Sequence, residues 1–207
     1  MTRHTNTVRL AVGAAALVWL AIGACSFGPQ ADSSTFYVLT SLDEMKGESL
    51  GMTGSSLAVG IGPVGFPAYL ARNGLVTRIS DNQVDISDVE RWAEPLPESV
   101  TETLAENLSV LLGTERVYST PWHSSVHLDY SIEMYVYRFE RDTLGVVRFM
   151  SRWTLRDAET GDELVRRETT LEEPAGSTGT GAAVAAQSRV LAAFSREIAD
   201  AILGLRP

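Results

Sequence analysis

Alternation of hydrophobic and polar positions is the clearest signal in the second half of the chain. Every second residue from Val126 to Val136 is apolar, and the same period returns from Val147 to Leu155, where arginines occupy positions of the opposite face. A period of two predicts strands with one buried face. Thr160-Gly161 marks a turn, after which we expect a third strand over residues 163–171. The pattern predicts an antiparallel meander with cross-strand ion pairs between arginines and acidic residues.

Shorter apolar runs predict four more strands in the first half of the chain. Phe36–Leu39 and Leu57–Ile61 are separated by a polar, glycine-rich segment over residues 41–55, which we expect to be a loop. Leu75–Ile79 and Val84–Ile86 follow closely on one another, as the two strands of a hairpin do. In the strand that begins at Val126, the face opposite Val136 becomes aromatic beyond Tyr135, where it carries Tyr137 and Phe139.

Two segments have the helical period instead. Apolar residues recur every three or four positions from Val100 to Leu111, and Gly113 is a typical helix end. An alanine-rich amphipathic segment over residues 182–203 closes the chain. Strands in this order with two helices predict an α/β (α+β) fold, a single domain with a mixed sheet, an antiparallel meander and two principal amphipathic helices.

The N-terminus carries a different pattern. Arg3 and Arg9 precede an unbroken run of apolar and small residues from Leu10 to Ile22. This run of 13 residues is too short to span a bilayer, which takes about 20 residues in a helix. It is typical of a signal peptide. We therefore expect an exported chain with a signal peptide over residues 1–24, a flexible tether over 25–35 and one domain over 36–207.

Small residues stand directly before Cys25, the only cysteine of the chain. This arrangement resembles a bacterial lipoprotein signal. The resemblance implies cleavage before Cys25, a diacylglycerol on its thiol and an acyl chain such as palmitate on the new amine. Two or three acyl chains hold a protein on a membrane almost permanently. Ser26, in place of aspartate, implies the outer membrane. The alternative, an uncleaved apolar leader or anchor that merely ends in Cys25, stays open.

Composition excludes some classes of function. The formal net charge of −9 leaves no basic footprint for nucleic acid and disfavours binding to anionic lipid by charge. With Cys25 as the sole cysteine, the domain folds without an internal disulfide. Stability must therefore come from packing, and attachment to a membrane from the acyl chains.

Candidate catalytic and metal motifs are weak. His123 and His127 are four residues apart, but no HExxH pattern accompanies them. The glycine-rich segment over residues 176–181 lacks the lysine of a phosphate-binding loop. A GxSxG nucleophile motif is missing as well. We predict a protein that is not an enzyme and has no metal or cofactor besides the lipid on Cys25.

Two linked segments rise above this background. Residues 66–78 read FPAYLARNGLVTR, and residues 92–96 read WAEPL. They resemble the PqiC-like family of ABC-type transport auxiliary lipoproteins, in which P-x-Y-L-x-R-x-x-[IV]-V-x-R precedes W-A-E-P-L and a helix. Asn73-Gly74 departs from the proline that commonly follows the first arginine of that pattern.

The resemblance implies a lipoprotein on the periplasmic face of the outer membrane, without catalysis, that docks an intermembrane lipid-transport system. Such systems contain MCE-domain proteins and ABC or permease components of the inner membrane. Two other classes remain: a structural envelope lipoprotein or assembly chaperone, and an envelope hydrolase, for which a catalytic cluster is missing. Homo-oligomer formation and direct lipid binding stay open.

The two segments also supply the candidate contact residues. Aromatic residues and arginine are favoured as interface anchors, and we expect the loop over residues 66–75 to present Tyr69 and Leu70 to an MCE partner or a neighbouring subunit. An alternative is purely structural: the aromatic rings pack, and Arg72, Arg78, Arg91 and Glu94 pair with one another. The candidate partner-binding residues are Tyr69, Leu70, Arg72, Arg78, Trp92 and Glu94.

Overall fold

A computed structural model describes residues 33–46, 55–123 and 125–205. The predicted signal peptide over residues 1–24, Cys25 and most of the predicted tether lie outside the described residues. The described residues from Ser34 onward belong to one compact unit. In the part of the chain that the structure describes, no helix combines the length and the apolar character needed to cross a membrane.

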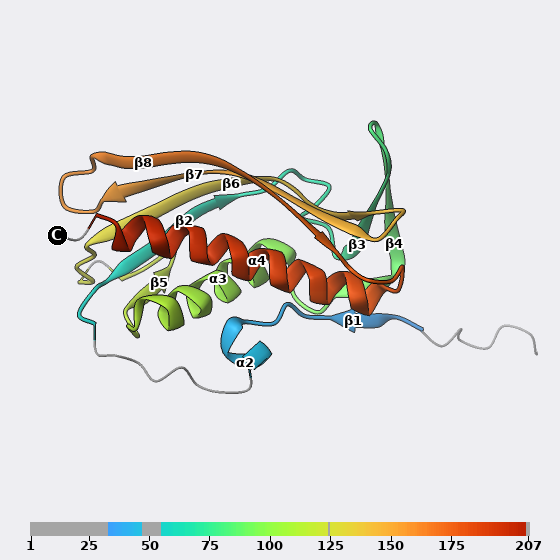
Figure 1. Cartoon of the computed structure of the whole chain (residues 1–207), viewed down its shortest axis with the longest axis horizontal. Coiled ribbons are helices and arrows are strands. Elements are labelled where there is room, and N and C mark those ends of the chain that lie inside the picture. Colours follow the sequence, from blue (N-terminus) through green and yellow to red (C-terminus); the bar gives the residue numbers. More distant parts are fainter. Residues whose placement is uncertain (1–32, 47–54, 124, 206–207) are drawn as a thin grey trace, which may run out of the picture. The chain divides into compact units, whose positions relative to one another are not determined.

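Within these residues, eight strands form one mixed sheet, and the two long helices cover one of its faces (Figure 1). The prediction of a single α/β domain with an antiparallel meander is confirmed. The strands are β1 (Thr35–Tyr37), β2 (Val59–Gly65), β3 (Gly74–Ser80), β4 (Gln83–Trp92), β5 (Val117–Ser119), β6 (Tyr130–Asp142), β7 (Val146–Asp157) and β8 (Glu163–Pro174). The helices are α2 (Leu42–Lys46), α3 (Leu96–Leu112) and α4 (Thr180–Leu203).

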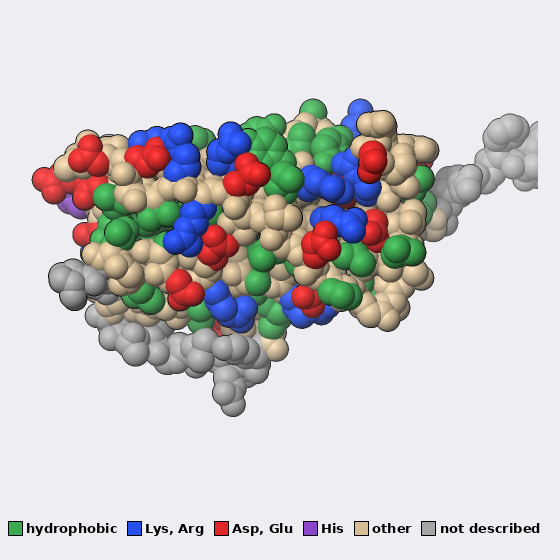
Figure 2. All heavy atoms as spheres, turned by 45° about the horizontal axis from the view of Figure 1, so that its top comes forward, with side chains coloured by type: hydrophobic (Ala, Val, Ile, Leu, Met, Phe, Trp, Pro, Cys, Tyr) green, Lys and Arg blue, Asp and Glu red, His purple; other side chains and the backbone are tan. Residues whose placement is uncertain are grey.

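The meander consists of β6, β7 and β8, paired in antiparallel register as predicted. Its outer face, which points away from the helices, carries interleaved basic and acidic side chains (Figure 2). The predicted cross-strand ion pairs are confirmed, although pairs this exposed contribute only about 0–1 kcal/mol each. They are Arg148–Glu172 at 2.7 Å, Arg152–Glu168 at 3.1 Å and Arg156–Glu133 at 3.4 Å.

A bulge in β6 corrects the prediction for Phe139. The register with β7 shifts between Val136 and Arg138, so that Tyr137 is the extra residue. One extra residue exchanges the two faces of a strand. Beyond the bulge, Phe139 therefore points into the core against Phe149, with ring centroids 5.5 Å apart. β6 also begins at Tyr130, later than the predicted start at Val126.

The other edge of β6 is shared by two strands, which the sequence does not predict. β2 runs parallel to the first half of β6, with Val59 opposite Tyr130, and β3 runs parallel to its last residues, with Arg78 opposite Asp142. β2 and β3 thus follow one another along the same neighbour. Beyond β2 lies β5, and beyond β3 lie β4 and β1. The sheet divides at the segment that connects β2 to β3.

Helices α3 and α4 bury their apolar faces against the sheet, as their periodicity predicts. Gly113 ends α3 in the left-handed conformation, with φ of 64°, and its amide donates to the carbonyl of Ser109. In the core, the ring of Phe194 on α4 lies 4.7 Å from that of Phe149. The helices and the meander thus pack into one core, and the connection between β2 and β3 lies against it.

Two short elements were not predicted. α2 lies within the segment that we expected to be a loop. Its start is a capping box, because the Ser41 amide donates to the Glu44 carboxylate at 3.0 Å. The buried Asn107 of α3 accepts from the Leu42 amide at 2.7 Å and donates to Ser195 of α4 at 3.0 Å. β5 extends the sheet beyond β2 with only three residues.

Candidate docking site

The segment that connects β2 to β3, residues 66–73, contains most of the first motif. It forms a compact turn in which the amides of Leu70 and Ala71 both donate to the carbonyl of Pro67. Leu70 is 1% exposed and belongs to the hydrophobic core. The segment is therefore anchored to the domain from the inside, and we call it the β2–β3 loop.

A buried carboxylate, Glu140 on β6, holds this loop from the other side. Its side chain is fully buried and accepts from four groups: two arginines, a backbone amide and a tyrosine hydroxyl. Arg78 of β3 pairs with it at 2.9 Å, and Arg138 does so at 3.0 Å. The amide of Phe139 donates to its second oxygen at 2.9 Å. A buried carboxylate is stable only when it is paired and hydrogen-bonded in this way.

Tyr69 completes this cluster. Its hydroxyl lies 3.2 Å from the carbonyl of Tyr137 and 3.3 Å from the Glu140 carboxylate, and Arg78 donates to the same hydroxyl at 3.3 Å. The Tyr137 carbonyl belongs to the bulge of β6, where the ladder to β7 is interrupted. Burial and the neighbouring Glu140 carboxylate raise the pKa of Tyr69 to about 12. These contacts fix the position of the β2–β3 loop. We call Tyr69, Arg78, Arg138 and Glu140 the Glu140 cluster.

The second motif lies directly beside the first. The amide of Trp92, the last residue of β4, donates to the carbonyl of Asn73 at 2.7 Å. Gly74 stands opposite Arg91 in the β3–β4 ladder. A Cβ at Gly74 would lie 2.2 Å from the carbonyl oxygen of Ser87, so only glycine fits this close approach. Asn73-Gly74, the departure from the family pattern, is the point where the two motifs meet.

The six predicted contact residues divide by exposure. Leu70 and Trp92, at 1% and 4% exposure, are core residues whose side chains cannot touch a partner in this conformation. Tyr69 and Arg78 are half-buried in the Glu140 cluster. Arg72 and Glu94 are exposed, and among the described residues neither has a hydrogen bond or an ion pair. Their charged groups are therefore available to another molecule.

The structure also corrects the alternative in which the motif charges pair with one another. Arg78 pairs with Glu140, outside both motifs, and Arg91 donates from Nε to the backbone carbonyl of Asp88 at 2.7 Å. Sequence reasoning missed Glu140 and Arg138 altogether. No sequence pattern distinguishes a buried acid in a strand from an exposed one, because its partners Arg78 and Tyr69 come from β3 and the β2–β3 loop, 62 and 71 residues away in the sequence.

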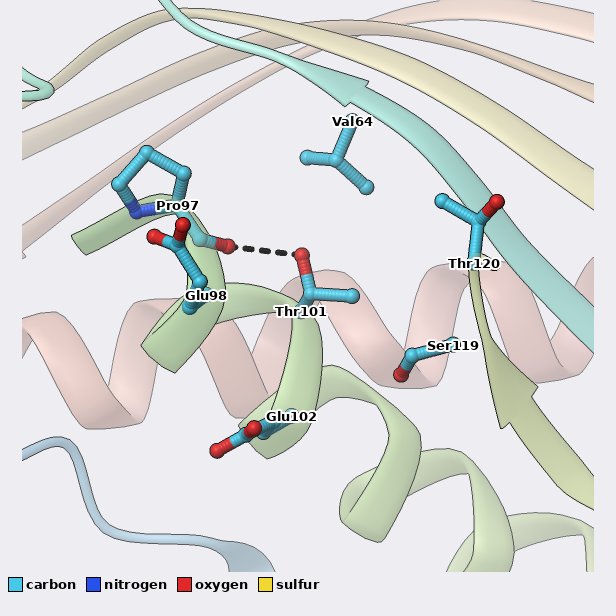
Figure 3. Close-up of a pocket in the computed structure, with 7 residues that line it drawn as sticks. All are labelled: Val64, Pro97, Glu98, Thr101, Glu102, Ser119 and Thr120. Atoms are coloured by element: carbon cyan, nitrogen blue, oxygen red, sulfur yellow. Dashed lines mark hydrogen bonds between the residues drawn. The ribbon is translucent and has the colours of Figure 1, made fainter. Parts of the chain in front are cut away.

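An open pocket of about 230 Å³ lies nearby, between the start of α3 and the strands β2 and β5 (Figure 3). Val64 forms an apolar side, and Glu98 and Glu102 project from the first turns of α3. Thr101 donates to the carbonyl of Pro97 at 2.7 Å. Ser119 and Thr120 line its β5 side.

Metal-ligand chemistry is absent from the part of the chain that the structure describes. His123 is exposed, and its Nδ1 lies 2.8 Å from the hydroxyl of Ser125. No three histidine, cysteine or acidic side chains of the described residues converge on a point where an ion could sit.

A family model describing the ABC-type transport auxiliary lipoprotein component matches residues 37–199. The chain belongs to this family. The match contains both motifs, the Glu140 cluster and the two exposed charges. It identifies an auxiliary component of a transport system and a lipoprotein, which agrees with the resemblance stated from residues 66–78 and 92–96.

Solved structures with the same fold span nearly the whole domain. A crystal structure of an uncharacterized protein is 27% identical, with a TM-score of 0.67, over 82% of this chain and 98% of that one. A Xanthomonas campestris protein of the DUF330 family is 17% identical, also with a TM-score of 0.67, over 83% of this chain and 97% of its own. Among curated proteins, none matches the chain. The chain thus shares its fold with solved structures, and its family describes an auxiliary component of ABC-type transport.

Proposed function

We propose that this chain is a non-catalytic docking subunit of an intermembrane lipid-transport system, held by the lipid on Cys25 at the periplasmic face of the outer membrane. The family match over residues 37–199 carries the proposal, because it assigns an auxiliary role in ABC-type transport to the entire folded domain. The proposed partner is an MCE-domain protein that works with ABC or permease components.

The geometry of the two motifs supports docking. Arg72 and Glu94 are exposed charges without partners in the described structure, and they belong to segments joined by the hydrogen bond from Trp92 to Asn73. The Glu140 cluster and the buried Leu70 fix the loop beneath them. Rigid presentation reduces the entropy that binding costs. In this account the other four candidate residues, Tyr69, Leu70, Arg78 and Trp92, position the contact surface rather than form it.

The anchor part of the proposal is tested with Cys25→Ala in the full chain. Two or more acyl chains make release from a membrane negligible, whereas the acidic domain has no charge-based affinity for anionic lipid. We expect the variant to lose incorporation of labelled palmitate and to leave the membrane fraction. Retention of an uncleaved variant on the membrane would instead indicate a helical anchor and contradict lipidation.

The docking part is tested by charge reversal, with Arg72→Glu and Glu94→Arg made separately. The matched control is Arg196→Glu, on an exposed position of α4. We expect each motif variant to weaken co-purification of the MCE-domain protein from crosslinked envelopes by about tenfold, equivalent to about 1.4 kcal/mol. Because the replaced side chains are exposed, unfolding free energies should change by less than about 0.5 kcal/mol. Equal recovery of the partner by all three variants would contradict this docking surface.

A further inference from the structure

Three of the most exposed apolar side chains in the described chain lie on β1 and β4 or directly after β1. Phe36 on β1 and Val38 directly after it are each 60% exposed, and Val89 on β4 is 49% exposed. A single exposed apolar residue needs no explanation, but a contiguous group marks a contact surface.

The register between β1 and β4 shows which of their side chains share a face. β1 pairs in parallel with β4, with Phe36 opposite Arg91 and Tyr37 opposite Trp92. Opposite residues of such a pair share a face, and so do residues two positions apart on a strand. Tyr37 and Trp92 point to the core, and the other face therefore carries Phe36, Val38 and Arg91. Val89 precedes Arg91 by two residues, at an irregular stretch of β4 where its amide donates to the Ser87 hydroxyl, and its side chain is exposed as well. We call these four residues the β1 face.

The covalent connection of β1 points to what covers this face. Only ten peptide units separate Cys25 from Thr35, and a fully extended chain of that length reaches at most about 36 Å. β1 is also the last strand of its side of the sheet, at the end of the domain where the chain enters it (Figure 1). Given a lipid on Cys25, the β1 face is the apolar surface that the tether keeps closest to the bilayer.

We propose that the β1 face rests on the membrane surface, with Phe36, Val38 and Val89 in the boundary between headgroups and acyl chains. This inference rests on the proposed function, because it requires the anchor at Cys25. Apolar side chains at this depth leave water without crossing the membrane. Arg91 extends from the same face, and an arginine can keep its guanidinium among phosphates while its stem lies against apolar surface.

The contact would orient the domain as well as attach it. β1 and β4 belong to the branch of the sheet that begins at the β2–β3 loop, whereas the turn between β7 and β8 lies at the opposite end of the meander (Figure 1). With the β1 face on the bilayer, the domain would have one preferred orientation toward the membrane. A tether alone would leave it free to rotate.

Single-cysteine labelling tests this in the full lipoprotein. A thioether at Cys25 leaves the chain without a free thiol, so Val38→Cys or Val89→Cys supplies one reactive site for a polarity-sensitive fluorophore. The control is Leu164→Cys, at the start of β8, whose side chain is 38% exposed. Each labelled protein is placed in vesicles of phosphatidylcholine and phosphatidylethanolamine, and its acyl chains are verified by mass spectrometry.

We expect labels at positions 38 and 89 to show blue-shifted emission and quenching by lipid-borne nitroxides, with neither effect at position 164. The label at position 89 should lose its shift when Phe36→Ser and Val38→Ser are added, while circular dichroism confirms that the domain is folded. An acylated, vesicle-bound protein with water-like emission at both positions would overturn the inference and leave the anchor intact. A blue shift that increases with protein density, without nitroxide quenching, would show that a second copy of the chain covers the β1 face instead of the bilayer. A protein without acyl mass would overturn both the anchor and the orientation.

Discussion

At the scale of single residues, Glu140 is the side chain that links the elements around the candidate site. Its buried carboxylate joins β6 to β3 through Arg78 and to the β2–β3 loop through Tyr69. Neither motif contains it. The motif residues Tyr69 and Arg78 hold this acid in place, and Leu70 fills the core. The side chains free to meet a partner are the neighbours that they position.

Glu140→Gln removes the charge and keeps the size of the side chain. Arg78 and Arg138 would then face a neutral amide in a buried place, and a broken buried ion pair costs about 3–5 kcal/mol. Part of that cost is avoided here because both arginines are partly exposed to water. We expect a loss of about 2–4 kcal/mol in the free energy of unfolding, measured by urea denaturation. Glu168→Gln, in an exposed pair with Arg152, is the control and should cost less than about 1 kcal/mol. Equal effects would show that the Glu140 cluster is not a special support.

At the scale of elements, the sequence predicts what its local periodicity encodes. The two-residue period gives the strands of the meander and their ion pairs, and the helical period with Gly113 gives α3 and its end. The bulge at Tyr137 escapes prediction because an inserted residue leaves the local composition unchanged while it exchanges the faces of everything after it. The serine and glutamate of the α2 capping box were visible in the sequence, and they could have predicted that helix.

The parallel pairing of β2 and β3 with β6 lies beyond such reasoning. It joins residues about seventy positions apart, such as Val59 and Tyr130, and no local pattern records which distant edge a strand will meet. For the same reason the sequence identified the two motifs but not the hydrogen bond between them. The motif residues stay candidate contact residues, and their division into buried supports and exposed charges required the structure.

The junction of the motifs gives a prediction for an element. Gly74→Ala puts a methyl group against the Ser87 carbonyl, where the chains of β3 and β4 approach most closely. Because backbone must move to relieve this clash, we expect a loss of about 1–3 kcal/mol and a lower melting temperature, measured by thermal unfolding. Gly181→Ala is the control, since nothing lies within 4 Å of the position of its Cβ. A Gly74→Ala variant as stable as Gly181→Ala would mean that this approach is not required.

At the scale of the whole molecule, the domain belongs to a family of ABC-type transport auxiliary lipoproteins, and its described residues form no group of three or more side chains that could hold a metal ion. The proposed arrangement gives its surfaces separate tasks. The β1 face meets the bilayer, the charged outer face of the meander stays in water, and the exposed charges at the motif junction receive the partner. A lipid on Cys25 would hold these surfaces at the membrane.

Site-specific photo-crosslinking in intact cells tests the central claim most directly. A photoreactive amino acid replaces Arg72 in the full lipoprotein, and the matched control places it at Arg196 on α4. The account predicts that irradiation joins position 72 to an MCE-domain protein, identified by mass spectrometry of the adduct, and that position 196 gives no such adduct. A correctly acylated and folded protein that forms no MCE adduct at position 72, with the MCE-domain protein present in the same cells, would contradict it.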